Sequence, residues 1–359
     1  MNILVTGGLG FIGSHTVVEL INNNYNVIIL DNLSNSKIEV LDKIYSLVCN
    51  SKSYNKTMLK FYEGNILNNT DLINIFLNHN IDIVIHFAAF KSVNESIEKP
   101  LNYYKNNVTG TLNLLETCQH YCVKYFIFSS SATVYGFSKS PLYENSQIGI
   151  GITNPYGQSK YMIENILQDI SKSKYNKMKI ISLRYFNPVG AHPSGLLGED
   201  PDDIPNNLMP YVIRVAIKNN LDSKLDDIYN YLSIFGDDYS TEDGTAKRDF
   251  IHVVDLADAH IAACKKIVNL ENNYEFYNIG TGNGISVLEI VNTFIKINKI
   301  KLPYKIKERR EGDLDIVYCN TEKANKELNW KAIKTLKDIC KDTYNFAKKL
   351  QSTPQQSHC

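Results

Sequence analysis

Six short apolar runs, separated from one another mostly by segments with helical spacing, occupy the first half of this chain. The runs are apolar on both faces and rich in β-branched and aromatic residues: ILVTG, NVIIL, KFYEG, DIVIHFAA, KYFIFSSS and KIISLRYF. Such runs are typical of buried parallel strands. Helical patterns at 14–24, 72–80, 101–121 and 154–171 lie between them. The alternation favours an α/β fold, a doubly wound parallel sheet with helices on both faces.

The alternation ends after about residue 188. The stretch GAHPSGLLGEDPDDIPNNLMP is rich in Gly, Pro and Asp, which predicts a long functional loop or lid. An apolar helix, short strands and further helical patterns follow, in an order typical of α+β structure. We therefore predict a sheet domain over 1–188 and a smaller α+β subdomain over 189–350, some of whose segments return to the core of the first. A flexible tail is expected over 351–359.

Charge and cysteine content restrict the class of protein. The 359 residues include 38 basic and 38 acidic side chains, and this balance argues against nucleic-acid and membrane-surface partners. The seven scattered cysteines do not form a disulfide framework, and Cys118 and Cys122 have no second ligand pair nearby, so no metal site is predicted. No apolar run is long enough to span a bilayer, and no leader pattern precedes the first strand. The expectation is a cytoplasmic protein.

A glycine-rich turn joins the first strand to the first helix. In ILVTGGLGFIGSHTVVEL, the glycines Gly7, Gly10 and Gly13 allow the backbone to approach a pyrophosphate, which the N–H groups of the helix N-terminus can bind. The spacing is G-x-x-G-x-x-G rather than the standard G-x-G-x-x-G. The second strand ends at Asp31, whose carboxylate can accept both adenosine ribose hydroxyls and would repel a 2′-phosphate. The pattern predicts NAD binding; a turn or capping role for Asp31 is the alternative.

The segment TNPYGQSKYMIEN places Tyr156 and Lys160 four residues apart on one helical face. The fifth strand ends in hydroxyls, FIFSSS, at the edge where parallel sheets bind ligands. An unperturbed tyrosine has a pKa near ~10, so ionisation near neutrality requires a lowering of about three units, or roughly 4 kcal/mol. Lys160 and an oxidised nicotinamide are the natural sources of that positive charge. The predicted task is removal of a hydroxyl proton while hydride leaves the carbon. A surface pair is the alternative, which the glycine turn and the serines disfavour.

Longer motifs extend this interpretation to nearly the whole chain, from Met1 to about Tyr344. TGGLGFIGSH, SSSATVYG, RYFNPVGAHPSG and RREGD together resemble the UDP-galactose 4-epimerase family of the extended short-chain dehydrogenase/reductase superfamily. The glycine and Tyr-x-x-x-Lys motifs identify only the superfamily, whereas the other three are more specific. The resemblance implies a Rossmann-type NAD-binding domain and a UDP-sugar-binding subdomain. It also implies an isomerase that interconverts UDP-galactose and UDP-glucose by inversion at C4, through a transient 4-keto sugar and tightly bound NAD.

Carried onto this sequence, the resemblance implies three catalytic residues. Tyr156 is the general base, Lys160 tunes it and binds the nicotinamide ribose, and Ser131 bridges the phenol and the sugar O4. For NAD, besides Tyr156 and Lys160, the implied positions are Gly7, Gly10, Phe11, Ile12, Gly13, Asp31, Asn32, Asn35, Ser36, Asn65, Ile66, Phe87, Ala88, Lys91, Asn106 and Tyr185. For the UDP-sugar, besides Ser131 and Tyr156, they are Lys91, Asn187, Asn207, Leu208, Ser233, Phe235, Arg248, Arg310, Asp313 and Val317.

Two positions depart from the family pattern or vary within it. Asn65 stands where the family usually has an aspartate that contacts adenine, so NAD binding is expected to survive with lower affinity. Val317 stands at the wall beside the sugar's C2 group, where the family varies between tyrosine and small residues. A small residue there predicts room for N-acetylhexosamine substrates. Because the family is usually homodimeric, the resemblance also implies a homodimer through helices 101–121 and 154–171.

Other functions on the same scaffold make different demands on the sequence. A sugar-nucleotide 4,6-dehydratase needs an acid just after the strand-end hydroxyl, but Ala132 and Thr133 follow Ser131. Decarboxylases share this scaffold as well. The chemistry of the site is compatible with a dehydrogenase that releases NADH, and only the more specific motifs disfavour that function. A binding or regulatory protein that has lost catalysis would usually lack the tyrosine or the lysine, and both are present.

Overall fold

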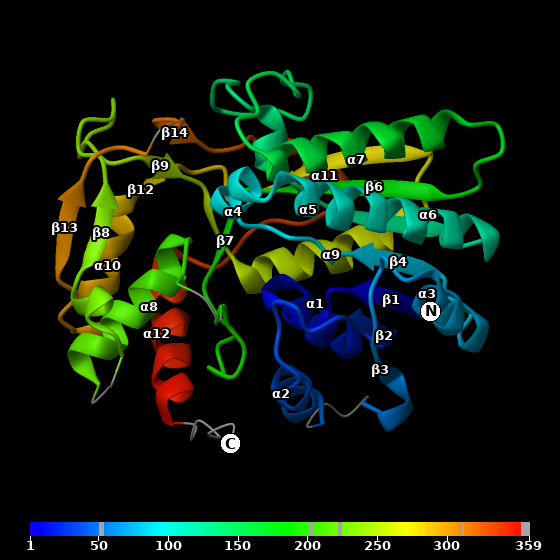
Figure 1. Ribbon diagram of the computed structural model, residues 1–359, viewed down its shortest axis with the longest axis horizontal. Helices are drawn as coiled ribbons and strands as arrows, with labels where there is room; N and C mark the ends of the chain where they lie inside the picture. Colours follow the sequence, from blue (N-terminus) through cyan, green and yellow to red (C-terminus); the bar gives the residue numbers. More distant parts are fainter. Residues whose placement is uncertain (50–53, 202–203, 222–224, 311, 353–359) are drawn as a thin grey trace.

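A seven-stranded parallel sheet forms the centre of the molecule (Figure 1). The computed structural model describes residues 1–359 except 50–53, 202–203, 222–224, 311 and 353–359. The strand order is β3-β2-β1-β4-β5-β6-β11, and every neighbouring pair is parallel. The strands are β1 (Asn2–Thr6), β2 (Asn26–Asp31), β3 (Leu59–Glu63), β4 (Ile83–His86), β5 (Tyr125–Ser131), β6 (Lys179–Tyr185) and β11 (Tyr274–Ile279).

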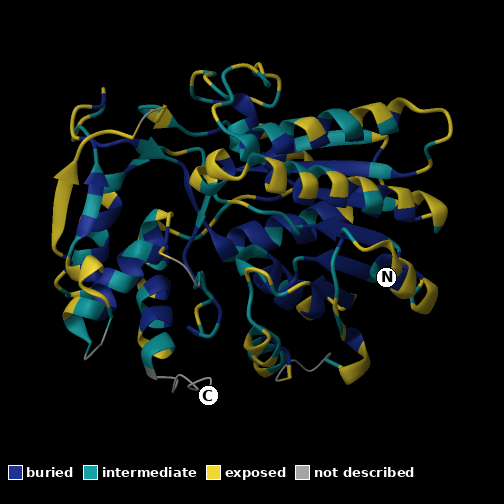
Figure 2. Ribbon diagram, in the orientation of Figure 1, coloured by how far each residue is buried: buried dark blue, intermediate teal, exposed yellow. Residues whose placement is uncertain are grey.

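Helices cover both faces of this sheet because its strands are buried on both sides (Figure 2). One face packs against α1 (Phe11–Asn22), α2 (Glu39–Val48) and α9 (Val253–Ile267). The other packs against α3 (Asn69–Asn78), α6 (Gly110–His120) and α7 (Pro155–Lys172). The predicted doubly wound α/β fold and its six strands are confirmed. The seventh strand, β11, comes from beyond the predicted boundary at residue 188, as does α9, so later segments do return to this core.

The segment between β4 and α6 forms a nearly continuous helical path whose middle is a π-helix. Its parts are α4 (Val93–Glu98), α5 (Pro100–Tyr103) and the π-helix η2 (Tyr104–Thr109), which runs directly into α6. π-Helical turns are rare and occur frequently at functional sites. Asn106, a predicted NAD contact, lies within this turn and is buried. The predicted helix over 101–121 is therefore confirmed in extent but not regular in geometry.

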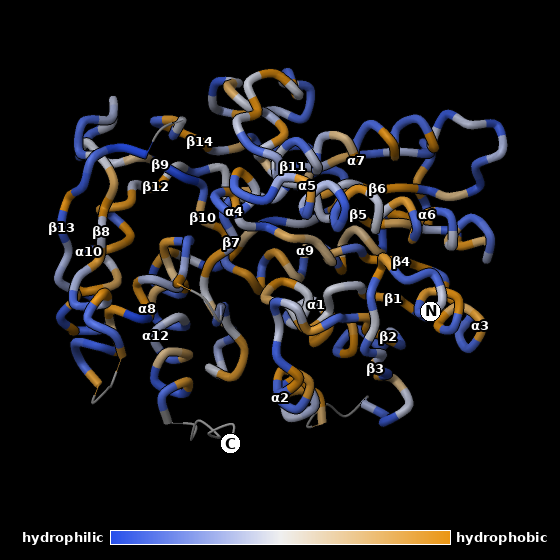
Figure 3. The backbone as a smooth tube through the Cα atoms, in the orientation of Figure 1, coloured by the Kyte–Doolittle hydropathy of each residue, from blue (hydrophilic) through white to orange (hydrophobic). Residues whose placement is uncertain are grey.

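A second group of helices and small sheets packs beside the carboxyl ends of the main strands. Its apolar core joins α8 (Leu208–Asn220), α10 (Val287–Asn298) and α12 (Leu336–Ser352), and hydrophobic residues mark these packed segments in Figure 3. The α12 helix extends two residues into the predicted tail, and 353–359 lie outside the described residues. The remaining strands are β7 (Asn187–Val189), β8 (Leu232–Phe235), β9 (Lys247–Arg248), β10 (Phe250–His252), β12 (Ile285–Ser286), β13 (Tyr304–Lys307) and β14 (Ile316–Val317). The remaining short helices are η1 (Lys56–Met58), η3 (Ala132–Tyr135), η4 (Asp227–Asn230) and α11 (Glu322–Glu327).

This architecture places a ligand site by topology alone. Strand order reverses between β1 and β4, and the loops that leave these strands diverge to opposite faces of the sheet. In open α/β sheets, ligands bind at the carboxyl ends of the strands at such a switch point. Within the described part of the chain, no helix has the length and apolar character needed to cross a bilayer.

Candidate active site

A cavity of about 430 Å³ lies along the carboxyl ends of the main strands and reaches the start of α8. It brings together most of the predicted site. The predicted residues that line it are Gly7, Gly10, Phe11, Ile12, Gly13, Asp31, Asn32, Asn35, Ser36, Ile66, Phe87, Ala88, Lys91, Asn106, Ser131, Tyr156, Lys160, Tyr185, Asn187, Asn207 and Leu208. Asn65, Ser233, Phe235, Arg248, Arg310, Asp313 and Val317 are not among the lining residues.

The glycine turn forms one end of the cavity with geometry that only glycine permits. Gly7 has φ +71°, and a Cβ there would lie 2.8 Å from the backbone N of Ala88. A Cβ on Gly13 would lie 2.2 Å from the carbonyl O of Gly7. Gly10 is the N-cap of α1, and no side chain caps the helix. Open backbone and an uncapped helix N-terminus suit a phosphate, so these residues fit a dinucleotide's pyrophosphate.

Asp31 lines the cavity and also braces the glycine turn. Its Oδ2 accepts a hydrogen bond from the backbone N of Leu9 at 2.9 Å. Its Oδ1 accepts from the N of Leu33 at 3.0 Å and from the Oγ of Ser36 at 2.8 Å. The turn role considered as the alternative is thus present in the structure. Contact with a ribose is compatible with it, since a carboxylate has about four acceptor positions, and it stays a prediction.

The start of α7 presents Tyr156 to the cavity. Asn154 caps the helix, with its Oδ1 accepting from the N of Gly157 at 2.8 Å, and Pro155 occupies the first turn. Both residues are favoured at these positions because an N-cap satisfies a free N–H and proline has none. Tyr156 therefore lies in the first turn, partly exposed, and lines the cavity together with Ser131.

Lys160 is buried one turn further along α7. Its Nζ donates to the carbonyl O of Ser129 at 2.6 Å and lies 5.9 Å from the centroid of the Tyr156 ring. It also lies 4.9 Å from the ring of Phe128. Burial lowers the pKa of Lys160 to about 7, and the negative charge of Glu164 opposes that shift. The lysine charge is therefore sensitive to its surroundings near neutral pH.

The protein chain by itself does not produce the lowered pKa that was expected for Tyr156. Burial raises the pKa of this phenol, and the hydrogen bond from Ser131 lowers it by less. The reason is that desolvation disfavours a phenolate, while the lysine Nζ donates to a carbonyl rather than to the phenol. A further positive charge is needed to make Tyr156 an efficient base near neutrality.

Two adjacent acids of the long loop, Glu199 and Asp200, line the cavity. The sequence analysis did not predict them as site residues. Glu199 Oε1 lies 2.5 Å from Lys91 Nζ and accepts from Asn207 Nδ2 at 3.1 Å. Asp200 pairs with Lys37 at 3.0 Å and with Arg214 at 2.7 Å. Each acid thus joins the sheet domain to the α8 segment. Because the paired residues lie far apart in sequence, no local pattern could have identified these contacts.

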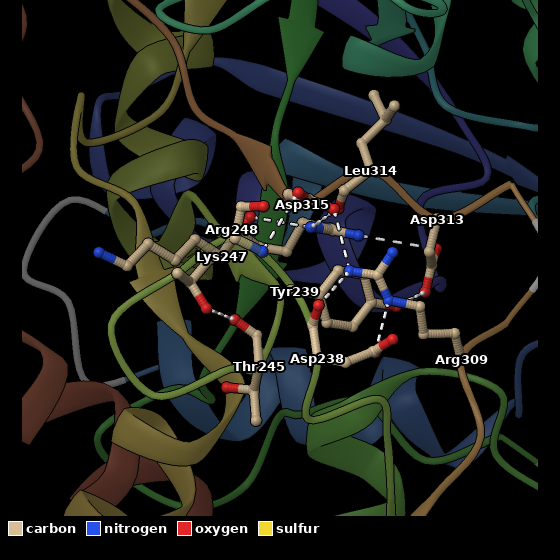
Figure 4. A network of polar contacts seen from close by, with 11 residues as sticks. Asp238, Tyr239, Thr245, Lys247, Arg248, Arg309, Asp313, Leu314 and Asp315 are labelled. Atoms are coloured by element: carbon tan, nitrogen blue, oxygen red, sulfur yellow. Dashed lines mark hydrogen bonds and ion pairs between the residues drawn. The ribbon is translucent and has the colours of Figure 1, made fainter.

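The predicted UDP-sugar contacts from the later part of the chain lie on the small strands and on the segment between β13 and β14; Figure 4 shows two of them, Arg248 and Asp313. Arg248 Nη2 lies 3.6 Å from Asp313 Oδ1, and the Tyr239 hydroxyl lies 3.5 Å from Asp313 Oδ2. The guanidinium of Arg310 lies 4.1 Å from the centroid of Phe235 on β8, the strand that also carries Ser233. The structure therefore brings these residues near one another, beside the cavity rather than on its lining.

Val317 and Asn65 lie just behind the cavity wall. Val317 pairs in register with Arg248 and packs in the apolar cluster that contains the lining residue Phe186. Asn65 Oδ1 accepts from the backbone N of Leu67 at 2.9 Å. The neighbours of Asn65 in sequence, Gly64 and Ile66, do line the cavity. The adenine and C2-group contacts predicted for these two residues stay predictions.

Residues 3–280 match the NAD dependent epimerase/dehydratase family. The chain belongs to this family. Its epimerase relatives include UDP-glucose 4-epimerase from Haemophilus influenzae (strain ATCC 51907 / DSM 11121 / KW20 / Rd), 50% identical with 97% of this chain and 98% of that protein covered. UDP-glucose 4-epimerase from Bacillus subtilis (strain 168) is 47% identical, with 96% of each chain covered. The family resemblance inferred from the sequence motifs is confirmed.

Solved structures of family members have the same fold. UDP-glucose-4-epimerase from Stenotrophomonas maltophila, with bound NAD and formylated UDP-arabinopyranose, has a TM-score of 0.90 and is 38% identical, covering 98% of this chain and 99% of that one. The Bifidobacterium longum enzyme, in complex with NAD⁺ and UDP, has a TM-score of 0.88 at 44% identity, covering 97% and 98%. The UDP-Glc/GlcNAc 4-epimerase from Campylobacter jejuni has a TM-score of 0.78 at 34% identity, covering 97% and 99%.

Proposed function

We propose that this chain is an NAD-dependent UDP-glucose 4-epimerase that interconverts UDP-galactose and UDP-glucose by inversion at C4. The observation that carries the proposal is the convergence of Ser131, Tyr156 and Lys160 on the same cavity that begins at the glycine turn. A hydroxyl, a phenol and an ammonium in one place suit removal of a proton from a sugar hydroxyl. The relatives named as UDP-glucose 4-epimerases support the same assignment.

The described residues fit NAD. Gly7, Gly13 and the N-terminus of α1 would hold the pyrophosphate, Asp31 the adenosine ribose, and Lys160 the nicotinamide ribose. When bound, NAD supplies a hydride acceptor and donor, so that the sugar C4 can become a ketone and then an alcohol again. A positive nicotinamide would also provide the charge that lowers the pKa of Tyr156.

Residues of the chain would then transfer the proton and bind the nucleotide. Tyr156 takes the O4 proton, directly or through Ser131, and returns it after the sugar has turned over. Lys160 stabilises the phenolate. Arg248 and Arg310 are suited to the UDP pyrophosphate because guanidinium groups are permanently charged, forked donors. Firm contacts to the nucleotide with loose contacts to the sugar would allow the 4-keto sugar to present its other face.

A direct test is to incubate the purified protein with UDP-galactose and no added cofactor. We expect an equilibrium mixture with UDP-glucose, resolved by chromatography, with NAD in the protein and no net NADH. Accumulation of NADH would indicate a dehydrogenase, and a dehydrated sugar would indicate a dehydratase. Failure to form UDP-glucose even with excess NAD would contradict the 4-epimerase proposal and favour another UDP-sugar or a non-catalytic role.

The small side chain of Val317 supports N-acetylhexosamine substrates as a second pair. Val317 packs against the apolar cluster that contains the lining residue Phe186, but does not itself line the cavity. The related Campylobacter jejuni enzyme is named for both glucose and N-acetylglucosamine substrates. We expect turnover of UDP-N-acetylgalactosamine, and Val317→Tyr should lower that rate by at least about tenfold. UDP-galactose turnover by the same variant is the control; no turnover of the acetylated sugar by the native protein would contradict the proposal.

A homodimer through the helices at 101–121 and 154–171 fits an apolar surface on α4–α7. Leu101 is 80% exposed and Ile97 is 59% exposed, and Leu112 and Met162 are also exposed. Exposed apolar side chains on neighbouring helices are typical of an association surface. Sedimentation equilibrium should give twice the mass of the chain, whereas a monomer at micromolar concentration would contradict the dimer. The cytoplasmic location stays a prediction.

A further inference from the structure

One face of α7 continues past the two residues that the sequence analysis singled out. Tyr156, Lys160 and Glu164 are each four residues apart and so lie one above another on the helix. Each one faces the end of β5: Lys160 bonds to the carbonyl of Ser129, Glu164 accepts from the hydroxyl of Ser130, and Tyr156 lines the cavity with Ser131, whose hydroxyl lowers the pKa of the phenol. Three successive serines are thus matched to three successive turns of α7.

Glu164 is fixed by contacts that leave it little freedom. Its Oε1 accepts from Ser130 Oγ at 2.5 Å and from Arg184 Nε at 2.9 Å, and its Oε2 accepts from Arg184 Nη2 at 2.7 Å. The Glu164 and Arg184 side chains are 3% and 2% exposed. Arg184 is held in turn by the Tyr135 hydroxyl at 2.9 Å and packs on the Phe276 ring.

A buried ion pair of this kind needs a reason other than stability. Replacing such a pair with apolar residues is often neutral or stabilising, because desolvating two charges costs about as much as their attraction returns. The pair does not line the cavity. Its Glu164 member lies on the same face of α7 as Lys160, whose ammonium is buried and whose charge the proposed reaction uses.

We propose that Glu164 is a positioning residue for the proposed epimerisation: anchored by Arg184 and Ser130, its carboxylate fixes a negative charge on the same face of α7 as Lys160 and favours the charged ammonium, which the Ser129 carbonyl holds beside Tyr156. The inference rests on the proposed function. The titratable groups that face Lys160 are Tyr156 and Glu164 on α7 and His86 on β4; on β6, Arg184 pairs with Glu164 and Tyr185 lies near Tyr156. Of these, Glu164 is the group whose charge opposes the loss of the lysine proton.

The two members of the ion pair should act on Lys160 in opposite directions. Glu164→Gln keeps an oxygen for Ser130 but removes the negative charge, so the pKa of Lys160 should fall further. Arg184→Gln removes the cation that neutralises Glu164, so the carboxylate should act more strongly on Lys160 and raise its pKa. Because the reaction needs a protonated Lys160, activity should begin to decline at a lower pH in Glu164→Gln and at a higher pH in Arg184→Gln.

The test measures kcat/KM for UDP-galactose between about pH 6 and 10, a range that covers the titration of Lys160, whose pKa is lowered to about 7. For Glu164→Gln we expect the midpoint of the alkaline decline in kcat/KM to fall by about one pH unit. At pH values above that midpoint, kcat/KM should then be about tenfold lower than in the native protein. Arg184→Gln should move it up. The KM should stay within about twofold, since neither residue lines the cavity. The proposal would be overturned if the pH profiles of kcat/KM for both variants differed from the native profile only by a constant factor.

A variant that leaves one buried charge unpaired can fail to fold. The double variant Glu164→Gln/Arg184→Met removes both charges, so its alkaline limb should lie between the limbs of the two single variants; a limb outside that interval would overturn the proposal. A second measurement does not depend on turnover. The phenolate absorbance of each protein is followed against pH, and the absorbance of the same protein carrying Tyr156→Phe is subtracted, which gives the titration midpoint of Tyr156. Glu164→Gln should raise the titration midpoint of Tyr156. If that midpoint moves but the native chain converts no UDP-sugar, the proposed function fails, and what remains is an electrostatic effect of Glu164 on Lys160 and Tyr156. If the native chain is active and the midpoint and the limb stay fixed, the role of Glu164 fails.

Discussion

Tyr156→Phe should lower kcat for UDP-galactose by about 10²- to 10⁴-fold, the range contributed by a single general acid or base. The substitution removes only the hydroxyl and leaves the ring that lies 5.9 Å from the Lys160 ammonium. No other phenol lies at that point of the cavity except Tyr185 among the described lining residues, and the Tyr185 hydroxyl is 2.6 Å from His260 Nε2. Single-turnover rates are the measurement of choice, because slow product release can mask chemistry.

The matched control for this prediction is Tyr161→Phe on the same helix. Tyr161 packs in the apolar cluster behind the cavity and does not line it. It should retain native kcat, while both variants keep native affinity for UDP by calorimetry. A Tyr156→Phe protein whose kcat stays within about tenfold of the native value would show that another group takes the proton.

Gly13→Ala should remove NAD from the purified protein. The new Cβ would lie 2.2 Å from the carbonyl O of Gly7 and 2.9 Å from the Cα of Gly8, both backbone atoms that cannot rotate away. Either α1 or the glycine turn must then shift. Overpacking of this kind costs about 1–3 kcal/mol, which corresponds to roughly five- to 150-fold weaker binding if the strain falls on the NAD site.

Nucleotide released from the denatured protein, compared with protein concentration, gives the occupancy directly. Gly284→Ala serves as the control, because the nearest atom to its Cβ would be at 3.4 Å, an ordinary contact. The two proteins should have similar secondary structure, with native occupancy only in the control. Full NAD occupancy in Gly13→Ala would mean that the turn is not the pyrophosphate site.

The main sheet and the glycine turn were predictable because they depend on short-range patterns. Strands buried on both faces must be apolar throughout, and their spacing along the chain sets the α/β alternation. Tyr156 and Lys160 were found by the same kind of signal, since helical geometry puts residues four apart on one face. The signal that would have found Glu164 was also present, one further step of four along the same helix.

The limits of sequence analysis are clear at β11 and in the ion pairs. Beyond residue 188 the apolar pattern is interrupted by loops, so nothing local indicated that Tyr274–Ile279 would pair with β6 as the seventh strand. Lys91 and Glu199, whose atoms are 2.5 Å apart, are separated by 108 residues. Such contacts depend on how distant segments are brought together by packing of the whole chain.

The sequence by itself determined the doubly wound sheet and the glycine turn, and it predicted Ser131, Tyr156 and Lys160 as site residues, because each of these features depends on residues that are neighbours on one strand, turn or helix. Only the tertiary structure decided their electrostatics. Burial raises the pKa of Tyr156 and lowers that of Lys160. The Glu164–Arg184 pair joins α7 to β6 beneath them. Desolvation and charge pairing depend on everything that surrounds a group in space, and that is set by the folded chain rather than by any stretch of its sequence.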